Sequence, residues 1–272
     1  MKLSFATLGC PKWNMQQIVD NGKAYGFDGV ELRGAPGEHI GPDESKESVQ
    51  NIKRMFDKGG MKVGCIMGYS NFTQTNPAEL QTAIDNAIKF CKVAKDLSCP
   101  TLRIFCGELK QDRDAGLRQI IASIKKITPH AADAGVKLAI ETHDDWCKGA
   151  NLMKVFNGVN SPALGVCWDI ANAFFVEPLE ETHKLIKDHI AHVHFKDAGH
   201  KPDGKVHSML PGTGEVDMLM GLKLLKQGGY DGWLSFEWEK KWEPDLAEPE
   251  VAFPHYMKHA QGLMAKAGVK RG

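Results

Sequence analysis

The chain has 272 residues, and its 34 lysines and arginines balance 34 aspartates and glutamates to a formal net charge of zero. Proteins that hold nucleic acid or an anionic membrane by bulk charge need a basic surface, so this balance argues against both classes of partner. A hydrophobic content of 42% and a charged content of 25% are typical of a globular protein. The length suits either two mid-sized domains or one α/β barrel, which takes about 250 residues.

The seven cysteines are an odd number and contain no Cys-x-x-Cys pair. This pattern indicates neither a disulfide framework nor a thiolate zinc site. No apolar run approaches the ~20 residues that cross a bilayer, and the first residues lack the core and cleavage site of a signal peptide. We therefore expect a cytoplasmic protein with no membrane partner, and a homo-oligomer is compatible with these features.

Short apolar runs alternate with longer segments of helical periodicity along the chain. The eight runs that we expect to form strands are Lys2–Leu8, Gly29–Arg33, Lys62–Met67, Thr101–Cys106, Lys137–Thr142, Leu164–Asp169, Ile190–Phe195 and Trp233–Glu237. The segments that we expect to form helices include Asn14–Tyr25, Lys46–Lys58, Pro77–Leu97, Asp112–Ala134, Leu179–Lys187, Asp217–Gln227 and Glu248–Ala267. Glycines follow several of these helices, as expected where a left-handed residue ends a helix.

Alternating strands and helices require parallel strands, which form either an open doubly wound sheet or a closed barrel. An open nucleotide-binding sheet is expected to show Gly-x-Gly-x-x-Gly after its first strand, and this chain has Gly9-Cys10-Pro11-Lys12 there. Eight units without a long linker favour closure. We predict an α/β fold of the (β/α)8 TIM-barrel type, with residues 1–272 forming a single domain.

Four consecutive strands of the predicted barrel end in residue types that bind metals: Glu141, Asp169, His194 and Glu237. The carboxyl ends of barrel strands meet at one mouth, where unpaired carboxylates would repel one another. A divalent cation removes that repulsion. Three carboxylates with one imidazole suit Mn²⁺ best, with Mg²⁺, Co²⁺ and Zn²⁺ as alternatives. One such carboxylate alone is more often a helix N-cap, so the prediction depends on the four together.

Strand alternation leaves one assignment open among the neighbours of these residues. His192, His194 and Lys196 share a face, and we interpret the deeper His192 as a core histidine. Glu237 and Glu239 also share a face, and periodicity alone does not separate them.

These segments resemble the sugar isomerase/epimerase superfamily with a xylose-isomerase-like barrel, which includes ketose 3-epimerases, hydroxypyruvate isomerase and inosose dehydratase. The matching segments are IETH (140–143), CWDIANAFF (167–175), HVHFKDA (192–198), PGTGEVD (211–217) and SFEWEKKW (235–242). The resemblance implies that the second histidine of HVH and the first glutamate of FEWE are metal ligands, together with Glu141 and Asp169. It also implies that Glu141 and Glu237 form the acid/base pair.

The resemblance extends to residues that would contact the substrate, namely His143, Asn172 and Lys196. Asn172 stands where ketose 3-epimerases carry a substrate-contacting histidine, and this difference argues against simple ketose 3-epimerase activity. Lys196 could polarise a substrate oxygen or form a loop salt bridge with Asp197. The glycine turn at 211–214 is more typical of a connection to an N-cap at Asp217 than of a phosphate site.

A metal chelated by a carbonyl and its neighbouring hydroxyl acidifies the C–H bond between them and stabilises the enediolate that deprotonation leaves. Two glutamates can then remove and return the proton. We predict a metal-dependent isomerase or epimerase of a small sugar, keto-sugar or polyol derivative. The alternatives are a dehydratase or lyase acting on a keto-inositol or 3-keto-glycoside, an apurinic-site endonuclease, and a non-catalytic sugar-binding barrel. The neutral charge and the single metal histidine count against the endonuclease.

Overall fold

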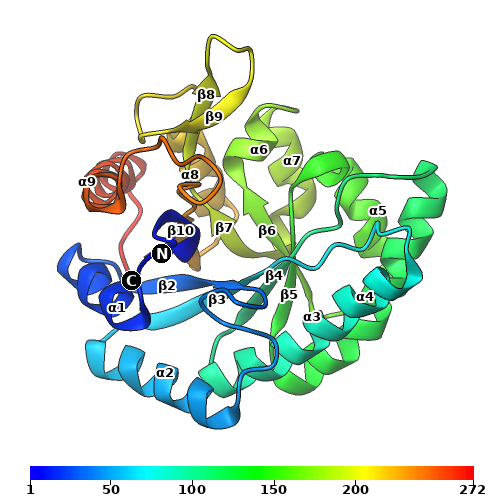
Figure 1. Ribbon diagram of the computed structural model, residues 1–272. Coiled ribbons are helices and arrows are strands. Elements are labelled where there is room, and N and C mark those ends of the chain that lie inside the picture. Colours follow the sequence, from blue (N-terminus) through cyan, green and yellow to red (C-terminus); the bar gives the residue numbers. More distant parts are fainter.

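The computed structural model describes all 272 residues and shows eight parallel strands closed into a barrel (Figure 1). The order around the barrel is β1-β10-β7-β6-β5-β4-β3-β2. The strands are β1 (Lys2–Ala6), β2 (Gly29–Gly34), β3 (Lys62–Gly68), β4 (Thr101–Ile104), β5 (Lys137–Glu141), β6 (Leu164–Asp169), β7 (Ile190–His194) and β10 (Trp233–Phe236). The predicted (β/α)8 barrel is confirmed, and each predicted strand is present.

Helices surround the barrel on the outside (Figure 1). They are α1 (Met15–Ala24), α2 (Lys46–Gly59), α3 (Pro77–Leu97), α4 (Arg113–Ala134), α5 (Gly149–Val159), α6 (Ile170–Phe174), α7 (Leu179–Ile186), α8 (Met218–Gln227) and α9 (Pro249–Ala267). The helices named from the sequence are all present, whereas α5 and α6 were not among them. The side chain of Lys148, at the N-cap of α5, makes no capping hydrogen bond, so this helix lacks the usual sequence signal at its start. No helix combines the length and the apolar character that crossing a bilayer requires.

A two-stranded antiparallel hairpin, β8 (Asp197–His200) and β9 (Val206–Met209), lies between β7 and α8 and projects from the barrel (Figure 1). The sequence did not predict it. Asp197 Oδ2 accepts hydrogen bonds from the backbone N–H groups of Gly212 and Gly214, at 2.8 and 2.9 Å. The glycine turn is thus tied to the base of the hairpin, and Asp217 caps α8 by accepting a hydrogen bond from the Met220 N–H at 2.8 Å.

The apolar core lies between the outer face of the barrel and the helices. Aromatic rings fill the part of it between α9 and the strands β1 and β10. The rings of Phe236 on β10 and Tyr256 on α9 stack with centroids 4.3 Å apart. The rings of Phe253 on α9 and Phe5 on β1 also pack together, with centroids 4.7 Å apart. Helix α9 therefore packs across the two strands that join the beginning of the barrel to its end. The termini also meet, because the Gly272 N–H donates to the Met1 carbonyl at 2.9 Å (Figure 1).

The barrel strands also bury an unusually polar set of side chains. Each of these residues is at most 4% exposed: Glu31, Arg103, Glu141, Asp169, His192, His194, Ser235 and Glu237. Barrel interiors are more commonly filled by layers of branched apolar residues. Because buried charges need partners, the contacts among these side chains define the candidate site.

Candidate metal centre and active site

Four side chains at the carboxyl ends of adjacent strands converge at the barrel mouth. Glu141 ends β5, Asp169 ends β6, His194 ends β7 and Glu237 directly follows β10. One ligand atom from each lies within 4.8 Å of the ligand atoms of the other three, and all four residues are buried. The strands follow one another around the barrel as β10, β7, β6 and β5, so closure of the sheet brings together positions that are far apart in sequence.

His194 lies at the centre of this group. Its Nδ1 is 2.8 Å from Glu141 Oε1, 3.3 Å from Glu237 Oε2 and 3.6 Å from Asp169 Oδ2. Burial lowers the pKa of His194, but the surrounding Cys167 and carboxylates outweigh it and raise the pKa well above its ordinary value. The three distances show that Nδ1 faces all three carboxylates, so the four side chains could bind one ion together.

Arg103 on β4 is the cationic partner of Glu141. Its guanidinium forms an ion pair with Glu141 and donates a hydrogen bond to the Gly68 carbonyl at 2.9 Å. Burial raises the pKa of Glu141, but the charges of Arg103 and His194 outweigh it and lower the pKa to about 2. Arg103 therefore keeps this carboxylate ionised.

Lys196 makes the corresponding contacts on the other side of the cluster. Its Nζ lies 2.5 Å from Glu237 Oε2 and 2.6 Å from Glu239 Oε1. It also lies 3.1 Å from Asp169 Oδ2. Burial lowers the pKa of Lys196, but the facing carboxylates raise it well above its ordinary value. The ion pairs of Lys196 are with these three carboxylates and not with Asp197, so the loop salt bridge considered from the sequence is absent. The contact with substrate remains a proposal.

The donor set fits a divalent cation. The mouth holds more carboxylates than permanent cations, since Glu239 joins the three acidic members of the group while Arg103 and Lys196 are the positive side chains that contact them. Asp169 Oδ2 is buried and accepts no hydrogen bond, and its only charged neighbour of opposite sign besides His194 is the Lys196 ammonium at 3.1 Å. Three carboxylates and one imidazole suit a hard or borderline divalent ion.

The other residues expected at the site lie around its edge. The Asn172 N–H donates to Asp169 Oδ1 at 2.8 Å, and the Asn172 side-chain amide donates to the Thr142 carbonyl at 3.2 Å. Asn172 therefore supports the junction between β6 and α6, where Asp169 is the N-cap of the helix. His143 has a side chain that is 40% exposed, with Nδ1 2.9 Å from the carboxylate of Asp144. Its ring lies beside Phe105, with centroids 5.5 Å apart.

Two residues that contact the cluster, Arg103 on β4 and Glu31 on β2, were not predicted from the sequence. Each is a single charged residue between two apolar neighbours, in Leu102-Arg103-Ile104 and Val30-Glu31-Leu32. A charge flanked in this way within a buried strand is a usable signal, because such a group must find a partner inside the barrel.

A family model described as xylose isomerase-like TIM barrel matches residues 19–258. The chain belongs to the xylose isomerase-like TIM barrel family. A curated relative, the inosose dehydratase of Yersinia enterocolitica, is 22% identical in an alignment that covers 97% of this chain and 98% of that protein. The resemblance seen in the sequence is confirmed at the level of this family.

Solved structures share the xylose isomerase-like barrel over nearly its whole length. An L-ribulose 3-epimerase gives a TM-score of 0.83 at 15% identity, covering 98% of this chain and 95% of that one. A D-tagatose 3-epimerase-like protein gives 0.82 at 18% identity, and the IolI protein with a bound zinc atom gives 0.79 at 17% identity; each match covers 98% of both chains. At these identities the likeness establishes the fold.

Proposed function

We propose that the protein is a metal-dependent isomerase or epimerase of a small sugar, keto-sugar or polyol derivative. Glu141, Asp169, His194 and Glu237 would hold one divalent ion, with Mn²⁺ as the first choice. The observation that carries the proposal is the convergence of these four buried side chains, with ligand atoms within 4.8 Å of one another, at the end of the barrel where such folds perform catalysis. The zinc atom of the similar IolI protein supports a divalent ion here and keeps Zn²⁺ as an alternative.

The reaction would be a proton transfer next to a carbonyl. A divalent ion held by Glu141, Asp169, His194 and Glu237 would polarise the carbonyl and acidify the neighbouring C–H bond. Glu141 on β5 and Glu237 after β10 flank the strands of Asp169 and His194, so one carboxylate can take the proton while the other returns it. Return to the opposite face of the same carbon gives an epimer, and return to the adjacent carbon gives an isomer.

The surrounding residues would prepare and orient this pair. Arg103 holds Glu141 in the ionised form that a general base needs, and Lys196 does the same for Glu237. We further propose that Lys196 and the half-exposed His143 contact substrate oxygens, while Asn172 acts mainly through its hydrogen bond to Asp169.

A small-molecule substrate and a cytoplasmic location also belong to this proposal. The net charge of zero is unsuited to nucleic acid. The seven cysteines are free and buried, which supports a reducing compartment.

Dehydration is the second candidate. Its support is the inosose dehydratase relative, whose alignment covers 97% of this chain. The first proton abstraction would be the same. Loss of a hydroxyl group β to the deprotonated carbon, assisted by an acid such as His143, would then replace return of the proton.

The test is solvent exchange in D2O with a panel of ketoses and keto-inositols, using enzyme loaded with Mn²⁺ and enzyme treated with a chelator. We expect metal-dependent deuterium incorporation that Glu237→Gln abolishes, whereas Glu239→Gln, the matched control two residues along, retains part of it. Equal incorporation with and without metal would overturn the proposal. A product that has lost water would select the dehydratase instead.

A further inference from the structure

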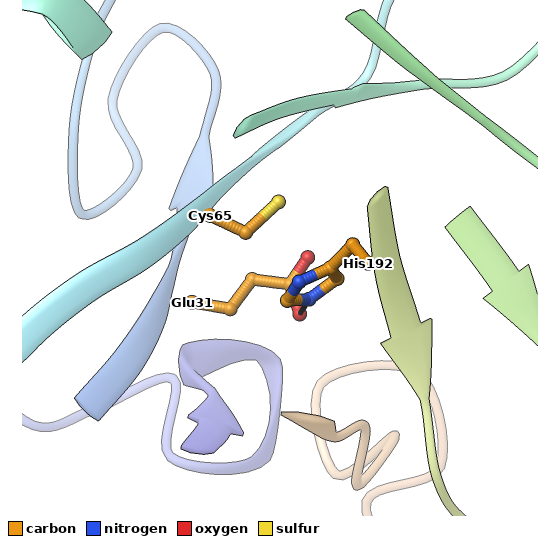
Figure 2. A group of neighbouring side chains, drawn as sticks. All are labelled: Glu31, Cys65 and His192. Atoms are coloured by element: carbon orange, nitrogen blue, oxygen red, sulfur yellow. Dashed lines mark hydrogen bonds and ion pairs between the residues drawn. The ribbon is translucent and has the colours of Figure 1, made fainter. Parts of the chain in front are cut away.

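A second layer of buried polar side chains lies below the proposed metal ligands. Glu31 on β2, Cys65 on β3 and His192 on β7 point toward one another in the barrel interior (Figure 2). All three are fully buried. Glu31 connects this layer to the mouth, because it contacts His194.

Glu31 links the two layers through separate oxygens. Its Oε1 lies 3.2 Å from His194 Nε2. Its Oε2 lies 3.1 Å from His192 Nε2 and accepts a hydrogen bond from Ser235 Oγ at 2.6 Å. His192 and Ser235 therefore hold the carboxylate in place while its other oxygen faces His194.

The orientation of His194 then has a chemical consequence. An imidazole that binds a metal through Nδ1 carries its proton on Nε2, and a carboxylate that accepts this proton's hydrogen bond sets both the tautomer and the ring orientation. Nδ1 of His194 faces the three carboxylates of the mouth, and Nε2 faces Glu31. The ring is thus placed with each nitrogen toward the partner that metal binding requires.

We propose that Glu31 is the positioning residue of the metal centre: it accepts the Nε2–H hydrogen bond of His194 and so presents Nδ1 to the ion. This inference depends on the proposed function. Glu31 on β2 would then determine part of the affinity for the metal, although β1 and β10 separate β2 from β7, which carries His194.

The same layer also has the composition of a second metal site, because Glu31, Cys65 and His192 place ligand atoms within 4.8 Å of one another. The hydrogen bonds argue against it. Both Glu31 oxygens already have partners, and Cys65 Sγ donates to the Ile66 carbonyl at 3.5 Å. An ion there would have to replace these bonds in a fully buried space.

The first test is calorimetric titration of metal-free protein with Mn²⁺. We expect Glu31→Gln to bind the ion about 10–100-fold more weakly than the unaltered protein. Ser235→Ala, which removes a bond only to the other oxygen of Glu31, should lose less affinity, and Cys65→Ala should keep it. Failure of the unaltered protein to bind Mn²⁺ would refute the proposed function. Binding by the unaltered protein with equal affinity in Glu31→Gln would overturn the role of Glu31 alone, and so would a second ion that Cys65→Ala removes.

The second test keeps the buried Glu31 unchanged, so its outcome does not depend on the folding of a variant. In the zinc-loaded protein, nitrogen NMR of the histidine side chains reports which ring nitrogen carries the proton. We expect a proton on Nε2 of His194 and a metal-shifted Nδ1. A proton on Nδ1 would overturn the proposal.

Discussion

The ammonium nitrogen of Lys196 lies 2.5 Å from Glu237 Oε2 and 3.1 Å from Asp169 Oδ2. These oxygens belong to two of the four side chains that we propose as metal ligands. Lys196 and a divalent ion would therefore compete for the same negative charge, so the stability of the metal-free protein and its affinity for metal should be linked.

Lys196→Met tests this link. Removing one partner of a buried ion pair costs about 3–5 kcal/mol, because the remaining charges are left uncompensated. We expect the metal-free variant to be less stable than the unaltered protein and to gain more in Tm when Mn²⁺ is added. Lys201→Met, at a partly exposed lysine of the hairpin, is the matched control. Identical metal-induced Tm shifts in Lys196→Met and the unaltered protein would contradict the competition.

The acid stability of the metal-free protein should depend on Glu141. Its pKa is about 2 in the folded protein, against an ordinary value of 4.5. The folded pKa is depressed, so its stabilising contribution is complete above pH 4.5 and is lost as the pH falls from 4.5 toward 2. Arg103→Met should flatten this part of the pH profile and lower stability at neutral pH. Urea unfolding across this range measures the slope, and an unchanged slope in the variant would show that Arg103 does not hold Glu141 ionised.

His39 should make the protein less stable between pH 6.5 and 4. Burial lowers the pKa of His39 from 6.5 to about 4, although its contact with the Trp13 carbonyl, 3.0 Å from Nε2, acts in the opposite direction. The unfolded chain therefore takes up this proton first as the pH falls, and stability decreases through that window. His39→Gln should remove this component, whereas His130→Gln, at an exposed histidine, should leave it. Urea unfolding at pH 7 and pH 5 measures the loss of stability between the two pH values. An equal loss in the two variants would refute this role of His39.

The packing of α9 on the barrel should depend on Phe253. This side chain is fully buried and contacts the ring of Phe5 at 4.7 Å. Phe253→Ala should cost about 3–5 kcal/mol of unfolding free energy, because it leaves a cavity between the helix and the strands that close the barrel. Val251→Ala on the same helix, where the residue is 57% exposed, should change it by less than about 0.5 kcal/mol. Denaturant unfolding measures both changes. An equal loss of unfolding free energy in Phe253→Ala and Val251→Ala would contradict this packing.

The sequence predicted the barrel and the four converging residues because both depend on local patterns. Apolar runs spaced by helices define parallel strands, and a polar residue at the end of such a strand must lie at the common mouth. The contacts of Glu31 could not be predicted in this way. They join β2 to β7, which are separated in the barrel by β1 and β10, and depend on side-chain direction inside the closed sheet.

The β8–β9 hairpin shows a second limit. Its strands are four residues each, and the buried part of β8 is Asp-Ala-Gly, which contains no large apolar side chain, so the sequence shows no apolar alternation there. Tertiary contacts, such as Asp197 accepting hydrogen bonds from the glycine turn, hold the hairpin in place. Lys196 is similar, because its neighbour Asp197 suggests a local ion pair while the fold directs its ammonium to Asp169, Glu237 and Glu239.

The most direct measurement is an anomalous difference map from crystals grown with Mn²⁺. It should show one peak at the barrel mouth, bound by carboxylate oxygens of Glu141, Asp169 and Glu237 and by Nδ1 of His194, with the ammonium of Lys196 displaced from the position that it has here. The absence of a peak among these four side chains at saturating Mn²⁺, or a peak among Glu31, Cys65 and His192 instead, would contradict the proposed metal centre.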